Sequence, residues 1–262
     1  MRPAHLLAAA LVIGMSALCV RLGFWQISRW HEKQRLNAEM RATLASPVLE
    51  LGGEPGAYGA VRGHRVAARG RFDESRQILL SLRTHEGSPG VEVVTPLVLA
   101  GGRQAVLVDR GWLYASDGAT ARPQDDREPG GRIVTGVPVE LARAPGGGAS
   151  SSALRLLARD SLTLWSARTL DPDSLAARFP YALAPWMLRE LPGPGVPARP
   201  LRSEPRPLDE MMHVSYAVQW FLFASILLGG SAALATSRRR RPRGGGEHRA
   251  TSEADPDLFR RG

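Results

Sequence analysis

The sequence predicts a membrane protein in which two transmembrane α-helices flank a β-rich (α+β) extracytoplasmic domain, built as an antiparallel sheet or a partly open barrel. Two observations support this fold class. Long apolar segments lie near both ends of the 262-residue chain, and short β-type runs separated by Gly and Pro fill the region between them. The composition, 44% hydrophobic and 23% charged, excludes a fully disordered or collagen-like chain.

The two apolar segments set the expected domain boundaries. A bilayer core of roughly 30 Å needs about 20 apolar residues as a helix, and both segments are long enough. The first segment also resembles a signal peptide, but its apolar character continues past any small-residue cleavage site, which favours a retained anchor. We expect a short cytoplasmic N-terminus (1–5), a first transmembrane helix (6–27), a periplasmic β-rich domain (28–212), a second transmembrane helix (213–236) and a basic disordered cytoplasmic tail (237–262).

The net charge of +9 lies mostly at the two ends of the chain. Residues 1–30 hold three arginines and no acidic residue, and residues 237–262 hold eight arginines and four acidic residues. An arginine run directly after a span is typical of the cytoplasmic side, so both termini are expected there, in a bacterial inner membrane. The tail is expected to fix topology and contact membrane lipids rather than nucleic acid. A single cysteine, Cys19, excludes an internal disulfide framework and a cysteine-based metal cluster.

The region between the spans contains short apolar runs bounded by turn residues, which predict strands. A helix over 30–44 is expected to continue the first span, and an acidic start with an early proline predicts a short helix over 171–179. The expected strands cover 64–72, 77–82, 91–98, 104–112, 132–141, 162–168 and 181–188. The expected loops are a polar one over 116–131, a flexible Gly- and Ser-rich one over 144–152, and an extended Pro-rich spacer over 191–208.

Sequence signatures of enzymes are absent. The chain has no GxSxG, HExxH, P-loop, GxGxxG or CxxC motif. We therefore expect a protein that is not an enzyme.

One group of candidate site residues opens the second span. His213, Tyr216 and Trp220 are spaced i, i+3 and i+7, so they share one face of a helix. An imidazole beside aromatic faces suits a porphyrin, with His213 as the metal ligand and the aromatic rings against the macrocycle. The same residues also suit an ordinary membrane interface, where Trp and Tyr are enriched.

A second group lies at the end of the first span. Arg21, Trp25 and Arg29 are spaced i, i+4 and i+8 and form a stripe expected at about the same depth. The arginines suit the propionates of a haem, and they equally suit snorkelling to lipid headgroups. Spacing alone leaves both interpretations open.

Four segments, in this order, resemble motifs of the Surfeit locus protein 1 family of assembly factors for haem-copper cytochrome c oxidase. The resemblance covers about residues 6–236. Asp109 stands where the family usually has Asn, and Met211 and Met212 stand where polar Asn residues are common. The matching segments are LGFWQISR (22–29), similar to LGxWQxxR; GVEVVTPL (90–97), similar to GxxVxTPL; VLVDRGW (106–112), similar to VLVNRGW; and HVSYAVQWF (213–221), similar to HxxYAxxWF.

The resemblance implies a non-catalytic factor that binds haem a at the outer membrane interface and aids its insertion into oxidase subunit I. It implies His213 as the haem ligand, with Trp220 also involved. The implied partners are cytochrome c oxidase subunit I and haem A synthase. Two alternatives stay open: a haem-free scaffold for oxidase assembly, and a membrane-tethered periplasmic sensor or interaction protein whose Arg-rich tail meets a cytoplasmic partner.

Overall fold

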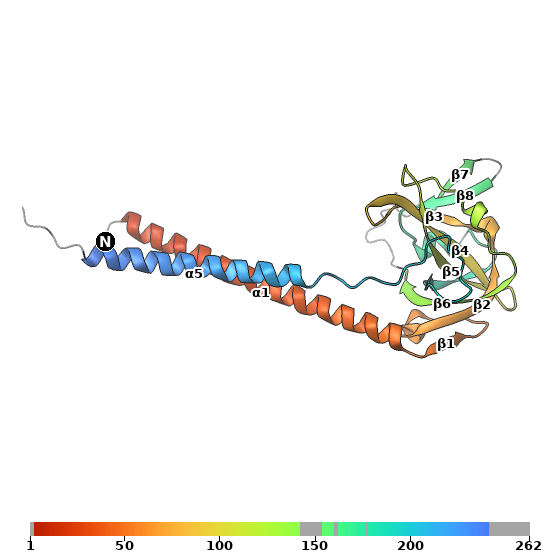
Figure 1. The fold of residues 1–262 in the computed structure, drawn as a ribbon, viewed down its shortest axis with the longest axis horizontal. Helices are drawn as coiled ribbons and strands as arrows, with labels where there is room; N and C mark the ends of the chain where they lie inside the picture. The colour runs from red at the N-terminus through yellow and green to blue at the C-terminus, as the bar shows by residue number, and fades with distance from the viewer. Residues whose placement is uncertain (1–2, 142–153, 160–161, 177, 241–262) are drawn as a thin grey trace, which may run out of the picture. The chain divides into compact units, whose positions relative to one another are not determined.

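The computed structural model of the chain describes residues 3–141, 154–159, 162–176 and 178–240 (Figure 1). The loop expected over 144–152 lies outside the described residues, as does the expected tail from residue 241 onward. The chain divides into two compact units: residues 1–33 with 209–262, and residues 34–208.

Two long terminal helices flank the strands, which are joined by turns, loops and short helices. The helices are α1 (Pro3–Ala45), α2 (Tyr58–Val61), α4 (Pro172–Ala176) and α5 (Met211–Arg240), with 3₁₀ turns η1 (Glu74–Arg76) and η2 (Pro123–Asp126). The strands are β1 (Val48–Leu51), β2 (Arg65–Phe72), β3 (Ile78–His85), β4 (Ser88–Leu99), β5 (Gln104–Tyr114), β6 (Gly131–Glu140), β7 (Arg155–Arg159), β8 (Leu162–Ala167) and β9 (Ala182–Glu190).

The two terminal helices are long and apolar enough, by length and composition, to cross a membrane. The candidate spans are Leu6–Ala45, with a peak mean hydropathy of 2.1, and Met211–Ser237, with 1.7. Helix α1 continues without a break to Ala45, which confirms the helix expected over 30–44. Its residues from Gln34 onward belong to the second unit.

The nine strands of the second unit form one sheet that closes on itself. The strand order is β1-β2-β6-β9-β5-β4-β3-β8-β7, and a further pairing of β2 with β4 closes a ring of five strands, β2, β6, β9, β5 and β4. The expected antiparallel sheet or partly open barrel is therefore a closed barrel-like sheet of mixed direction. Strand β9 runs parallel to β5, β8 parallel to β3 and β1 parallel to β2. Parallel neighbours require long crossovers, and the segment between β5 and β9 supplies one.

The interior of the ring is filled by alternate residues of its five strands. Because side chains of a strand alternate between faces, every second residue points inward. The inward-facing residues of β5 include Val106 and Val108, and those of β9 include Ala184, Trp186 and Leu188. One cluster joins these to Val66, Ala68, Phe72, Leu97, Leu99 and Val134 from β2, β4 and β6.

The outer face of the ring is covered by β3, β8 and α4. Leu175 of α4 is buried beside Ile78 and Leu107 in a second apolar cluster. The side chain of Asp171 accepts hydrogen bonds from the backbone N–H and the hydroxyl of Ser174, at 3.2 and 2.7 Å, and so caps α4. The short helix expected over 171–179 is thus confirmed at its start.

The Pro-rich segment 191–208 is extended and is bonded to the barrel. Leu201 and Trp112 exchange backbone hydrogen bonds of 2.8 and 2.9 Å. Gly111 has φ +111°, and a Cβ there would collide with the carbonyl oxygen of Leu201. Only glycine combines this conformation with this close approach. A segment expected to act as a spacer therefore forms part of the folded domain.

Candidate functional site

The two long helices of the first unit pack along a seam of small side chains. The residues of α1 on the seam recur every three or four positions, the spacing of one helix face. At Gly23 a Cβ would lie 2.7 Å from the ring of Phe221, so this close approach requires glycine. The buried seam residues are Ser16, Cys19, Gly23 and Gln26 of α1 with Ala217 and Ala224 of α5.

His213 lies in the first turn of α5, which a side chain fixes in place. Asp209 accepts hydrogen bonds from the backbone N–H groups of Met211 and Met212 at 2.9 and 3.4 Å, the bonding of an N-cap. The ammonium of Lys33 donates to the carbonyl of Asp209 at 2.9 Å and ties the cap to α1. His213 therefore projects from a helix start that is anchored on both helices.

The ring of His213 contacts Gln26 across the seam. Nδ1 of His213 lies 2.6 Å from Oε1 of Gln26, and Gln26 is only 8% exposed. An amide oxygen accepts hydrogen bonds, so this contact favours the tautomer in which Nδ1 carries the proton. Nε2 then holds the lone pair, and it is the nitrogen available to a metal.

The aromatic residues predicted to accompany His213 lie in different surroundings. Trp220 is half-buried and packs edge-on against Phe223, with ring centroids 5.9 Å apart. Tyr216 is 47% exposed, one turn from His213. Trp220 and His213 therefore border the seam, whereas Tyr216 lies on the open surface of α5.

The predicted stripe on α1 lies apart from the seam. Arg21, Trp25 and Arg29 are exposed, whereas the seam face of α1 at this level is formed by Gly23 and Gln26. Arg29 pairs with Glu32 at 2.6 Å on the surface. The structure thus brings His213 together with Gln26, not with this stripe. The roles of Arg21, Trp25 and Arg29 as haem contacts stay predictions.

Gln26 lies in the segment LGFWQISR (22–29), but no role for it was predicted from the sequence. A glutamine inside an apolar span is a signal in itself, because its amide needs a hydrogen-bond partner there. Among the described residues no group of three or more His, Cys, Asp or Glu could hold a metal ion. One histidine nitrogen can serve as a protein ligand of a haem iron, and haem binding through His213 stays a prediction.

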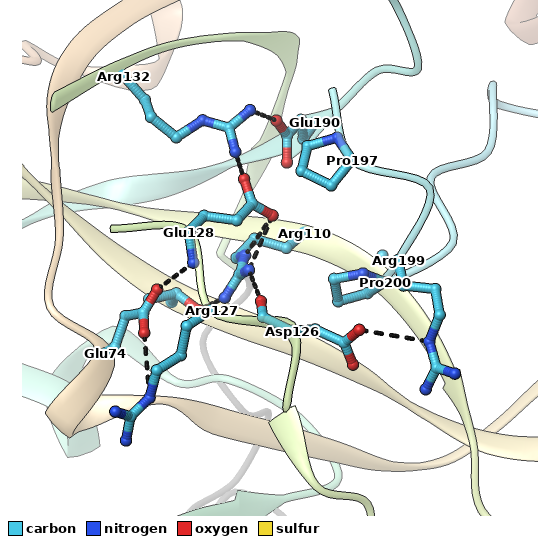
Figure 2. A network of polar contacts seen from close by, with 12 residues as sticks. Glu74, Arg110, Asp126, Arg127, Glu128, Arg132, Glu190, Pro197, Arg199 and Pro200 are labelled. Carbon is cyan, nitrogen blue, oxygen red and sulfur yellow. Dashed lines mark hydrogen bonds and ion pairs between the residues drawn. The ribbon is translucent and has the colours of Figure 1, made fainter. Parts of the chain in front are cut away.

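A second polar site is a network of charged residues around Arg110 and Glu128 in the barrel domain (Figure 2). Arg110 follows Val108 on β5 in the inward set, and it is fully buried. Its guanidinium donates to Glu128 at 2.8 Å and to the carbonyl of Asp126, and it lies 5.0 Å from the ring centroid of Phe72. Burial, reinforced by the positive charge of Arg202, lowers the pKa of Arg110 to about 10.

Two further arginines complete this arrangement. Arg202 of the Pro-rich segment donates to Glu190 at 2.8 Å and contacts Glu128. Arg132 of β6 pairs with Glu128 and lies 3.6 Å from Glu190. We call Arg110, Glu128, Arg132, Glu190 and Arg202 the buried ion network. It joins β5, β6, β9, the loop before β6 and the Pro-rich segment, which indicates a structural role.

A polar cavity of about 280 Å³ opens next to this network. Asp109, on the outward side of β5, is buried in its wall, accepts from the N–H of Gly111 at 3.0 Å and pairs with Arg189 at 3.2 Å. Burial and the neighbouring Glu92 raise the pKa of Asp109 to about 6. The residues that line the cavity include Thr84, His85, Glu92, Asp109, Trp112 and Arg189.

Comparison with known proteins identifies the family. The chain is 31% identical over 128 residues to an uncharacterized SURF1-like protein of Mycobacterium bovis, covering 47% of each chain. It is 34% identical over 98 residues to a SURF1-like protein of Rickettsia felis, covering 37% of this chain and 42% of the relative. These matches span less than half the length of the curated relatives. The model of the SURF1 family matches residues 13–225, most of the chain, and the protein therefore belongs to the SURF1 family.

Proposed function

We propose that this protein is an assembly factor for haem-copper cytochrome c oxidase that binds haem a through His213 and aids its insertion into subunit I. Membership of the SURF1 family supports the link to oxidase assembly. The observation that carries haem binding is the contact of Nδ1 of His213 with Gln26, which leaves Nε2 as the nitrogen with a free lone pair.

The residues around His213 suit this role. A protein side chain holds the iron of a haem, and Nε2 of His213 would be the ligand here. When bound, the haem would supply the iron and a flat apolar macrocycle, and Trp220 is a candidate to lie against that surface. Tyr216, Trp25, Arg21 and Arg29 are further proposed contacts, the arginines through the propionates.

The proposed location is a bacterial inner membrane, with both termini in the cytoplasm and the barrel domain in the periplasm. Helices α1 and α5 are the proposed spans, and their apolar exposed surfaces suit lipid. The arginines that follow the candidate span Met211–Ser237 favour a cytoplasmic C-terminus. The proposed partners are subunit I, haem A synthase and membrane lipids.

The test is a deletion strain scored for haem a oxidase activity, with absorption spectra of the purified full-length protein. We expect a Soret band in protein from cells that make haem a. His213→Ala should lose the band and fail to restore oxidase. His31→Ala is the matched control, because His31 is an exposed histidine on α1 of the same unit, and it should behave as wild type.

Two other outcomes would favour the alternatives. If the wild-type protein restores oxidase but is colourless, and His213→Ala also restores it, the protein is a haem-free scaffold. If deletion of residues 244–262 abolishes function, a sensor that acts through its cytoplasmic tail is favoured, because the assembly role expects little effect.

A further inference from the structure

We propose that Gln26 is a positioning residue for the haem ligand: its amide oxygen accepts a hydrogen bond from Nδ1–H of His213 and so holds Nε2 as the metal-binding nitrogen. This inference rests on the proposed haem binding by His213, and it assigns to Gln26 the choice of tautomer and the orientation of the ring. The two residues are 187 positions apart in sequence and meet only because α1 and α5 pack together.

The first argument is the geometry of the contact. The distance of 2.6 Å between Nδ1 and Oε1 places the two atoms in direct hydrogen-bond contact. Free histidine in water exchanges between two neutral tautomers, whereas an acceptor fixed at Nδ1 selects the one with Nε2 unprotonated. Histidines that bind metals almost always donate their second N–H to such a partner.

The second argument is the burial of Gln26. Gln26 is 8% exposed and belongs to the same buried seam as Cys19, Gly23 and Ala217, where the loss of water costs free energy unless the amide is bonded. An apolar residue at this position would leave no polar group to satisfy in the seam. The glutamine is therefore explained by its partner, His213, more directly than by the seam.

The third argument is the charge of the acceptor. A neutral amide orients the imidazole and raises its basicity less than a carboxylate would. Moderate ligand strength suits a protein that must pass its haem to another protein. Gln26→Glu should therefore strengthen binding of ferric haem relative to ferrous haem, because partial proton transfer to a carboxylate gives the ring negative character.

The experiment compares full-length wild type, Gln26→Leu, Gln26→Glu and His213→Ala in detergent micelles. Gln219→Leu is the matched control, because Gln219 is an exposed glutamine on α5. The first measurement needs no haem. Nitrogen-15 chemical shifts of the ligand-free protein, at a pH where histidine is neutral, should show Nδ1–H for His213 in wild type. They should show a shift toward the Nε2–H form in Gln26→Leu only.

The second measurement titrates each variant with ferric haem b as the probe and records the reduction potential of the complex. Gln26→Leu should bind about 10- to 100-fold more weakly, the usual effect of losing such a partner. Gln26→Glu should bind at least as tightly as wild type and have a lower potential, by about 59 mV for each tenfold gain in ferric over ferrous affinity.

The outcomes separate the two proposals. If wild type and His213→Ala bind haem b equally, ligation by His213 is wrong, and the role of Gln26 in ligation falls with it. If His213→Ala loses binding while Gln26→Leu keeps both the affinity and the tautomer of wild type, only the Gln26 proposal is wrong. If Gln26→Leu weakens binding but Gln26→Glu leaves the potential unchanged, the bond merely joins the helices and the proposal also fails.

Discussion

Replacing Asp109 with asparagine is expected to stabilise the barrel domain at neutral pH. Burial, and then the charge of Glu92, raises the pKa of the Asp109 carboxyl from 3.8 to about 6, although Arg189 partly offsets these effects. Between these two pKa values the folded protein holds a proton that the unfolded chain has released. The stability that the protonated carboxyl provides is lost as the pH rises through about 6. Asparagine stays neutral, and its amide oxygen can still accept from Gly111.

The magnitude follows from the two pKa values of Asp109. A carboxyl pKa raised from 3.8 to about 6 costs the folded state about 3 kcal/mol once the group is ionised, near pH 7.5. Near pH 4.5 the folded carboxyl is still protonated, whereas the carboxyl of the unfolded chain is mostly ionised. Because this pH is less than about one unit above the unfolded pKa, the cost is only about 1 kcal/mol. The gain in unfolding free energy from Asp109→Asn should therefore grow by about 2 kcal/mol between these pH values.

The assay is urea unfolding of the full-length protein in micelles, followed by tryptophan fluorescence, to which the buried Trp186 contributes. Asp117→Asn is the control. Hydrogen bonds from Thr120 and Ala119 lower the pKa of the exposed Asp117 to about 2. Its stabilisation is lost only as the pH falls from about 4 to about 2, so its effect should be constant over the tested range. If the effect of Asp109→Asn is also constant, Asp109 has no raised pKa and the reasoning is refuted.

Three further predictions concern packing. Glu128→Gln should lower the free energy of unfolding by about 3–5 kcal/mol in the same urea assay, because it leaves the buried Arg110 and Arg202 and the partly buried Arg132 with one carboxylate of the network. Gly111→Ala should release the Pro-rich segment, through the collision with Leu201, and trypsin should then cleave within residues 191–208 faster. Gly23→Ala should open the helix seam at Phe221, so that a membrane-permeant maleimide labels the buried Cys19 faster.

Each of these three changes has a control in the same chain. Glu140→Gln removes an exposed carboxylate and should leave the urea midpoint unchanged. Gly102→Ala introduces the same left-handed strain, at φ +71°, but with open space around the new Cβ, so tryptic cleavage of the Pro-rich segment should not change. Gly14→Ala also meets open space and should leave labelling of Cys19 as it is. Equal effects of a variant and its control would contradict the corresponding contact.

The sequence was most informative where a structure depends on local pattern. Alternating apolar residues predicted β2, β5 and β9 within a few residues of their observed bounds, because burial of one face requires that alternation. Strands β1 and β7 were not predicted, since four or five residues carry too little periodicity. The parallel pairing of β5 with β9 was also missed, because strand order depends on contacts between segments far apart in sequence.

Some features of the candidate site could also be predicted from local sequence, whereas others depend on contacts between distant segments. His213 and its helical spacing were evident from the sequence, whereas the partner of its Nδ1 lies on the other helix. Glu128 and Arg202 occur in segments rich in Pro and Gly that were predicted as loops, and both are buried. Nothing in their neighbouring residues distinguishes them from solvated charges. Only the arrangement of the barrel brings them to Arg110.

The position of β9 in the ring affects how the chain folds as it is made. Residues 182–190 insert between β5 and β6, so a nascent chain that has completed β6 still presents both strands as unpaired edges. Arg110 then also lacks Glu190 and Arg202 of its network. Open edges of this kind promote pairing with other chains. A ribosome that stalls before residue 190 would thus release an aggregation-prone product, and chaperone demand should peak within this window of synthesis.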